Sequence, residues 1–82
     1  MTNQEIIDKH TTINWSNISR EPNLPEDFIR EYQDRVDWGS ISFTQDLSED
    51  FIREFKDRVW WSSVSVFQTL SDEFREEFKD RL

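Results

Sequence analysis

The side chains of this chain that could do chemistry are its carboxylates and a single histidine. Eighteen Asp and Glu stand against ten Lys and Arg, with one His and no Cys. Acid–base catalysis would need such groups gathered in a concave site that shifts their pKa values. The lack of cysteine excludes thiolate metal sites and a disulfide framework. Only carboxylate chemistry is left to consider.

The spacing of these carboxylates favours a structural use. Most lie three or four residues from an opposite charge, an arrangement that is typical of a solvated helix face and contributes about 0.2–0.5 kcal/mol per pair. The predicted pairs are Glu31 with Arg35, Glu54 with Arg58, Glu77 with Arg81, and Arg53 with Asp57. We expect His10 to be exposed or at a helix end. The sequence thus predicts no catalytic residue, no cofactor and no metal site.

A sequence repeat must position these groups. Residues 14–36, 37–59 and 60–82 align without a gap as three copies of 23 residues, and residues 1–13 precede them. The columns that coincide are Trp15, Trp38 and Trp61; Ile18, Ile41 and Val64; Leu24, Leu47 and Leu70; Phe28, Phe51 and Phe74; Tyr32, Phe55 and Phe78; and Val36, Val59 and Leu82. We therefore treat 1–82 as one repeat domain with an N-terminal cap at 1–13.

The second half of each copy predicts a helix, most clearly over 48–59. Ser48 can cap the first turn, and Leu47 can pack on Ile52 as a hydrophobic staple. Phe51, Phe55 and Val59 then lie on one helical face.

The first half of each copy predicts a single helical or 3₁₀ turn. Its apolar residues lie three apart, and Asn14 and Asp37 precede the tryptophan as caps in the first two copies. One long and one very short helix cannot bury their faces alone, so the copies must stack. The sequence predicts an all-α fold, a short α-solenoid of three 23-residue units with an N-terminal capping helix.

The two ends of the array differ from its middle. Arg75 replaces Ile29 and Ile52, as expected where no further copy covers that face. In the cap, Met1, Ile6 and Ile13 align with the Leu, Ile and Val columns. Glu5 and Lys9 replace its two aromatic residues, which is typical of a polar outer surface.

The second copy carries the pattern W-x-x-I-S-x-x-Q-x-L-S-E-D-F-I-R-E-F, from Trp38 to Phe55. This pattern resembles a tandem repeat found in phages, large DNA viruses and some bacteria, and the similarity covers 14–82. The first copy departs from it, because Pro22 replaces Gln and Pro25 replaces Ser. In size and charge the chain also resembles small acidic phage inhibitors of host defence, including anti-CRISPR proteins. That resemblance implies an inhibitory role.

The charge distribution indicates a basic partner. A net charge of −8 argues against unassisted binding of DNA or RNA, whose backbones are also negative. Glu76 replaces Arg30 and Arg53, so the last helix is locally the most acidic. We expect a non-enzymatic protein that occludes the nucleic-acid-binding surface of a host defence protein as a nucleic-acid mimic. The candidate acidic residues are Asp72, Glu73, Glu76, Glu77 and Asp80.

Three aromatic residues support an alternative function. Trp60 stands where the other copies have Asn14 and Asp37, and Phe43 and Phe67 lie outside the repeat columns. Exposed aromatic side chains are common binding hot spots. The alternative is therefore a protein–protein adaptor or a self-assembling scaffold, although these rings could also enlarge a small core.

The sequence carries no targeting signal that we can identify. Glu5 and Asp8 interrupt the first residues, so no apolar signal core is present. No stretch approaches the roughly 18–20 apolar residues of a membrane helix. We expect a cytoplasmic protein without a membrane partner, in the host cell if the gene belongs to a phage.

Overall fold

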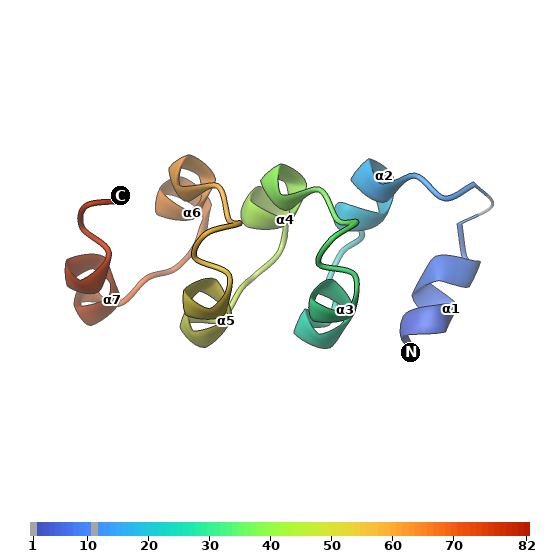
Figure 1. Cartoon of the computed structure of the whole chain (residues 1–82), viewed down its shortest axis with the longest axis horizontal. Helices are drawn as coiled ribbons and strands as arrows, with labels where there is room; N and C mark the ends of the chain where they lie inside the picture. Colours follow the sequence, from blue (N-terminus) through green and yellow to red (C-terminus); the bar gives the residue numbers. More distant parts are fainter. Residues whose placement is uncertain (1, 11) are drawn as a thin grey trace.

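The computed structural model describes residues 2–10 and 12–82, and the regular secondary structure in these two ranges is all helical. The helices are α1 (Asn3–Asp8), α2 (Trp15–Ser19), α3 (Glu26–Glu31), α4 (Trp38–Thr44), α5 (Glu49–Glu54), α6 (Trp61–Phe67) and α7 (Asp72–Glu77). They form an elongated molecule of 42 × 19 × 19 Å. Helices α2, α4 and α6 make one row along the long axis, and α1, α3, α5 and α7 make a second (Figure 1). None of the described helices has the length and apolar character needed to cross a membrane.

Side-chain caps fix where most helices begin. The Asn14 carboxamide oxygen accepts hydrogen bonds from two amides at the start of α2, and the Asp37 carboxylate does the same for α4. Ser48 Oγ accepts from the Phe51 amide at 3.1 Å at the start of α5. All three predicted caps are confirmed. At α6 the N-cap is Trp60, which makes no side-chain cap hydrogen bond.

The predicted lengths of the helices are wrong. Helix α5 ends at Glu54, not at Val59, and has 6 residues, whereas α4 has 7. A continuing helix would direct the Lys56 carbonyl to an amide four residues later. Instead this carbonyl accepts from Trp61 Nε1 at 2.9 Å and from Arg81 Nη1 at 2.8 Å. After α3 the Gln33 carbonyl accepts equivalent bonds from Trp38 Nε1 and Arg58 Nη1. These contacts stabilise the turns after α3 and α5. A copy therefore contains two helices of similar length.

The core lies between the two rows. It is formed by the predicted columns, and the largest fully buried side chains include Phe28, Phe51, Phe74, Ile18 and Ile41. The repeated tryptophans are half-buried at its edge, where the Trp38 ring lies 5.0 Å from that of Phe55, centroid to centroid. Full burial of one such apolar side chain stabilises a fold by about 1.5–3 kcal/mol.

The ends follow the predicted pattern only in part. Ile6 is buried in the cap and Arg75 is exposed on α7, as expected. The prediction that Ile13 joins the valine column of the core is wrong, because 59% of Ile13 is exposed. Val36 and Val59 are buried, whereas Ile13 lies at a shallow hollow that Ile7, Trp15 and Tyr32 also line. Met1 lies outside the described residues.

Candidate functional site

Two buried glutamines join each copy to the one before it. Gln45 Oε1 accepts from the Leu24 amide at 3.0 Å, and its Nε2 donates to the carbonyls of Ser19 and Glu21 at 3.1 and 2.8 Å. Gln68 binds one amide and two carbonyls in a similar way one copy later: it accepts from the Leu47 amide and donates to the carbonyls of Ser42 and Gln45, the last being one residue beyond the counterpart of Glu21. The sequence pattern contains this glutamine, but its spacing alone gave no sign of the role. These glutamine bridges fix the spacing of every surface described below.

The first acidic column caps helices of the following copy. The Glu26 carboxylate accepts from the Ser48 amide at 2.7 Å and from its hydroxyl at 3.0 Å. Glu49 accepts from the amide and hydroxyl of Ser71 at 2.6 and 3.1 Å. The hydrogen bond from the Ser71 amide lowers the pKa of Glu49 below its ordinary value. These carboxylates are therefore committed to structure.

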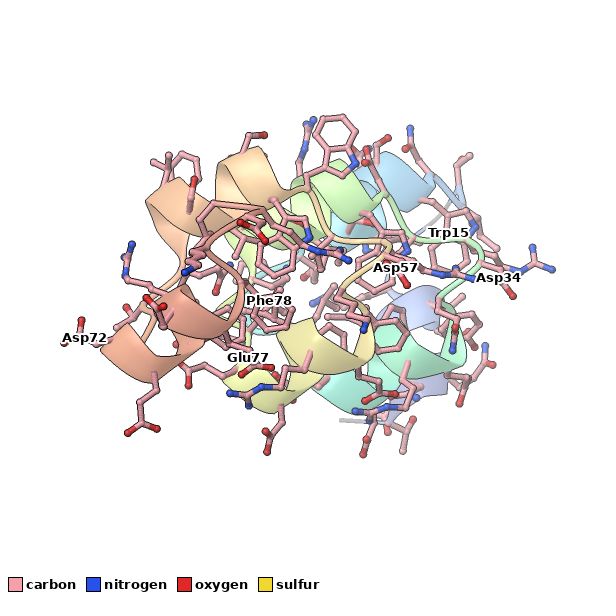
Figure 2. All side chains as sticks on the ribbon, turned by 60° about the vertical axis from the view of Figure 1, so that its left-hand side comes forward. Trp15, Asp34, Asp57, Asp72, Glu77 and Phe78 are labelled. Atoms are coloured by element: carbon pink, nitrogen blue, oxygen red, sulfur yellow. The ribbon has the colours of Figure 1, made fainter. Side chains whose placement is uncertain are left out.

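A second set of carboxylates pairs with arginines of the preceding copy. Arg30 donates to both carboxylate oxygens of Glu54, each at 2.8 Å, and its guanidinium lies over the Phe51 ring. The hydrogen bond from Arg30 lowers the pKa of Glu54. Arg53 pairs with Glu77 in the same way, at 2.9 Å. Glu77 is thus tied to α5, and Figure 2 shows it between α7 and α5.

Among the described residues, none of the four ion pairs predicted within helices forms. Arg58 instead pairs with Asp34 at 2.9 Å, and Arg81 with Asp57 at 3.4 Å. The reason is that α3, α5 and α7 end early. In each predicted pair the second residue, four positions after the first, therefore lies in the turn that follows the helix and not on the helix face. Figure 2 shows Asp34 and Asp57 on these turns.

The remaining acidic candidates gather at the last helix. Asp72, Glu73, Glu76 and Asp80 are all exposed, and we call them the acidic end. Within the described chain their one ion pair is Glu76 with Lys79 at 3.2 Å. Glu76 stands where Arg30 and Arg53 supply the cation to the other lower helices. Figure 2 shows Asp72 directed away from the molecule.

The three aromatic candidates lie together on the neighbouring helices α4 and α6. The Phe43 and Phe67 rings are 5.6 Å apart, centroid to centroid, and are 45% and 60% exposed. Trp60 is 58% exposed, and its indole lies so close to α4 that a Cβ on Gly39 would be 3.2 Å from three of its atoms. Val66 is 72% exposed. We call Phe43, Trp60, Val66 and Phe67 the apolar strip.

Sequence reasoning missed Val66, although a signal for it existed. Val66 occupies the repeat column of Phe43, where the first copy has Arg20. Because Phe43 and Phe67 belong to adjacent columns, their contact joins two copies, and Val66 extends the same apolar surface.

The two rows of helices differ in charge. Helices α2, α4 and α6 contain no Asp, Glu, Lys or Arg, whereas α1, α3, α5 and α7 each carry charged residues. The molecule therefore has one uncharged row that bears the apolar strip and one charged row that ends at the acidic end.

No three His, Asp or Glu side chains within residues 2–10 and 12–82 lie close enough together to hold a metal ion. A hollow at the N-terminal end is lined by Lys9, Glu21 and residues 22–25. Glu21 accepts from Lys9, which lowers the pKa of its carboxyl group, and His10 Nε2 lies 3.3 Å from the same carboxylate. The charges of Lys9 and Glu21 therefore offset each other.

Comparison with protein-family models, with curated proteins and with solved structures finds no match to this chain.

Proposed function

We propose that this protein is a short α-solenoid of three 23-residue units with an N-terminal cap, and that it acts without catalysis by covering a basic surface of another protein. The recurrence of the glutamine bridges from copy to copy supports the solenoid. The resemblance to phage repeat proteins and to small anti-defence proteins suggests the target. It would be a nucleic-acid-binding defence protein in the cytoplasm of a host cell.

The observation that carries this proposal is the excess negative charge at the acidic end. Elsewhere the acidic columns are occupied by caps and ion pairs, so most of their carboxylates have a structural partner. At α7 Glu76 replaces the arginine that serves as this partner, while Arg75 replaces an isoleucine, so α7 carries a net charge of −3 where α3 and α5 each carry −2. Exposed like charges at one end of an elongated molecule produce a field that steers positively charged partners.

The same field explains why a basic protein surface is a better partner than nucleic acid. The phosphate backbone would be repelled by the net charge of −8. A groove that normally holds this backbone carries Lys and Arg, and carboxylates can occupy it in place of phosphates.

Affinity capture with matched charge variants tests the proposal. The baits are the natural protein, Glu76→Lys and the control Asp46→Lys, which changes the net charge equally but lies in the loop before α5, away from α7. Bound proteins from a bacterial lysate are eluted in salt steps and quantified by mass spectrometry. Reversal of one exposed charge in an ion pair alters binding by about 1 kcal/mol, or about fivefold.

We expect nucleic-acid-binding proteins to elute at moderate salt from the natural bait and from Asp46→Lys, and to be depleted about fivefold on Glu76→Lys. Two results would count against the proposal. One is equal retention on both variants. The other is a partner that stays bound at about 1 M salt, where the Debye length is only about 3 Å.

A further inference from the structure

We propose that the uncharged row, centred on the apolar strip, is the interface between two copies of this chain in a two-fold dimer. This inference is independent of the proposed function, because it concerns the opposite row of helices. Four large apolar side chains are exposed on two adjacent helices. The question is what covers them.

The distribution of charge over the two rows favours a second copy of this chain as the partner that covers the apolar strip. Each copy carries a net charge of −8, so contact between two charged rows would be repulsive. Helices α2, α4 and α6 carry no charged residue, so two copies that meet on this row oppose fewer carboxylates than two copies that meet on the other row. Asp37, the N-cap of α4, is half-buried, and its carboxylate accepts from the first amides of that helix. A basic partner would be attracted to the charged row instead. Interface centres are depleted of charge and enriched in aromatic residues, as the apolar strip is.

A stable dimer must use more of the row than the apolar strip. A standard interface takes roughly 800 Å² from each partner, and one whole side of this molecule measures only 42 × 19 Å. Thr44, Ser62 and Thr69, which are close to strip residues in the sequence, are exposed and carry uncharged hydroxyl groups. Apolar anchors within a polar, uncharged surround are the usual arrangement of binding hot spots.

The strip is also suited to two-fold pairing. On α6 it runs from Trp60 at the N-cap to Phe67 at the last residue, and the small, half-buried Ser63 lies between them. A two-fold rotation that reverses the helix direction places Trp60 of one copy against Phe67 of the other, twice. Such an isologous contact closes on itself and does not continue into a fibre.

Trp60 provides a separate argument. Asn14 and Asp37 cap their helices with side-chain oxygens, whereas Trp60 makes no cap hydrogen bond and leaves 58% of its surface exposed. Loss of a polar cap destabilises a helix. An exposed indole at this position therefore lowers the stability of the single chain, and burial against a second copy supplies a compensating interaction.

Analytical ultracentrifugation of the purified full chain tests the proposal. Each variant replaces a strip residue with the residue that the first copy has at the same repeat position. Phe67→Glu follows Glu21, and Phe43→Arg follows Arg20, so the repeat already accommodates both side chains. Ile13→Ser is the control, because Ile13 is as exposed as Phe67 but lies outside the strip. Circular dichroism confirms that each variant folds.

The expected result is a mass of twice 10.1 kDa at micromolar concentration for the natural protein and for Ile13→Ser. Phe67→Glu should weaken dimerisation by about tenfold or more. Added salt should strengthen the dimer by screening the repulsion between copies, and Glu76→Lys should leave it intact. Failure of the acidic end to bind a partner would therefore not affect this result.

Three outcomes would overturn the proposal. The natural protein could remain at 10.1 kDa up to millimolar concentration. Phe67→Glu and Phe43→Arg could dimerise as tightly as the natural protein, which would place the interface elsewhere. The chain could also stay monomeric while a different protein binds it in a manner that depends on Phe67.

Discussion

Removal of one glutamine bridge should destabilise the whole molecule. In Gln45→Ala the Leu24 amide and the Glu21 carbonyl lose the side chain that now satisfies them at 3.0 and 2.8 Å. The Ser19 carbonyl keeps a hydrogen bond from Thr44 Oγ1 at 3.2 Å, so it is affected less. Gln45 is 4% exposed, which limits the access of replacement water.

The expected loss in the free energy of unfolding follows from these contacts. An unsatisfied buried polar group costs about 1–3 kcal/mol, so two such groups should lower the free energy of unfolding by about 3 kcal/mol. A chain of 82 residues has a total stability of about 4–12 kcal/mol. The expected fall in Tm is about 15 °C, since 1 kcal/mol corresponds to about 4–8 °C in a small domain. Gln68→Ala should lower the Tm by a similar amount, because Gln68 also binds one amide and two carbonyls of the preceding copy.

Urea unfolding followed by tryptophan fluorescence measures this loss. Gln33→Ala is the control, because Gln33 is half-buried and donates only to the Arg30 carbonyl of its own turn at 3.0 Å. It should cost less than about 1 kcal/mol. A loss below about 1 kcal/mol in Gln45→Ala as well would refute the reasoning, because it would mean that water replaces the bridge at little cost.

Three further predictions concern stability. Because the Ser71 amide lowers the pKa of Glu49 in the folded protein, the contribution of this carboxylate should be constant at neutral pH and be lost as the pH falls below its ordinary value of 4.5. Urea titrations at stepped pH should show a shallower decline for Glu49→Gln, and an unchanged decline would contradict the assignment. Ser48→Ala should lower the free energy of unfolding by about 1 kcal/mol in thermal melts, through loss of the cap of α5, and no change would argue against that cap. Gly39→Ala should be neutral or stabilising by up to about 1 kcal/mol, because alanine favours helix and the exposed Trp60 ring can shift. A destabilised variant with unchanged tryptophan fluorescence would show that the ring is fixed.

Local chemistry was predictable from the sequence. Asn14, Asp37 and Ser48 were identified as caps because a cap needs only a side-chain oxygen two or three residues from the amides it binds. The buried columns of Phe51 and Ile41 were identified for a similar reason, since a repeated apolar position points to a repeated core. A cap and the amides it binds are two or three residues apart, and the residues of a buried column recur every 23 residues, so both can be read from the sequence alone.

The partners of the charged residues were not predictable in this way. Glu54 has an arginine four residues later and another in the preceding copy, and both choices fit the pattern of residue types. The end of α5 decides between them, because Arg58 then lies in a turn while Arg30 faces Glu54 across the copies. Helices α3, α5 and α7 all end at equivalent residues, and α7 does so without a contact of this kind among the described residues. A spacing rule for charges does not reveal this helix end.

The same distinction applies to the candidate site. Five acidic residues were chosen from the composition of the last helix, yet Glu77 is held by Arg53 while Glu76 is not. The choice of Phe43 and Phe67 came from their absence from the repeat columns. Their contact across copies and the exposure of Val66 required the arrangement of α4 beside α6.

The glutamine bridges all point backward along the chain, which has a consequence for synthesis on the ribosome. The loop of the first copy depends on Gln45, so it cannot be completed while that residue is still inside the exit tunnel. Each newly emerged copy then finishes the one already outside. Removal of residues from the carboxyl end by an exopeptidase should reverse this order. Loss of Arg81, Glu77 and Ser71 would break their contacts with the preceding copy before loss of Gln68 releases the amide of Leu47.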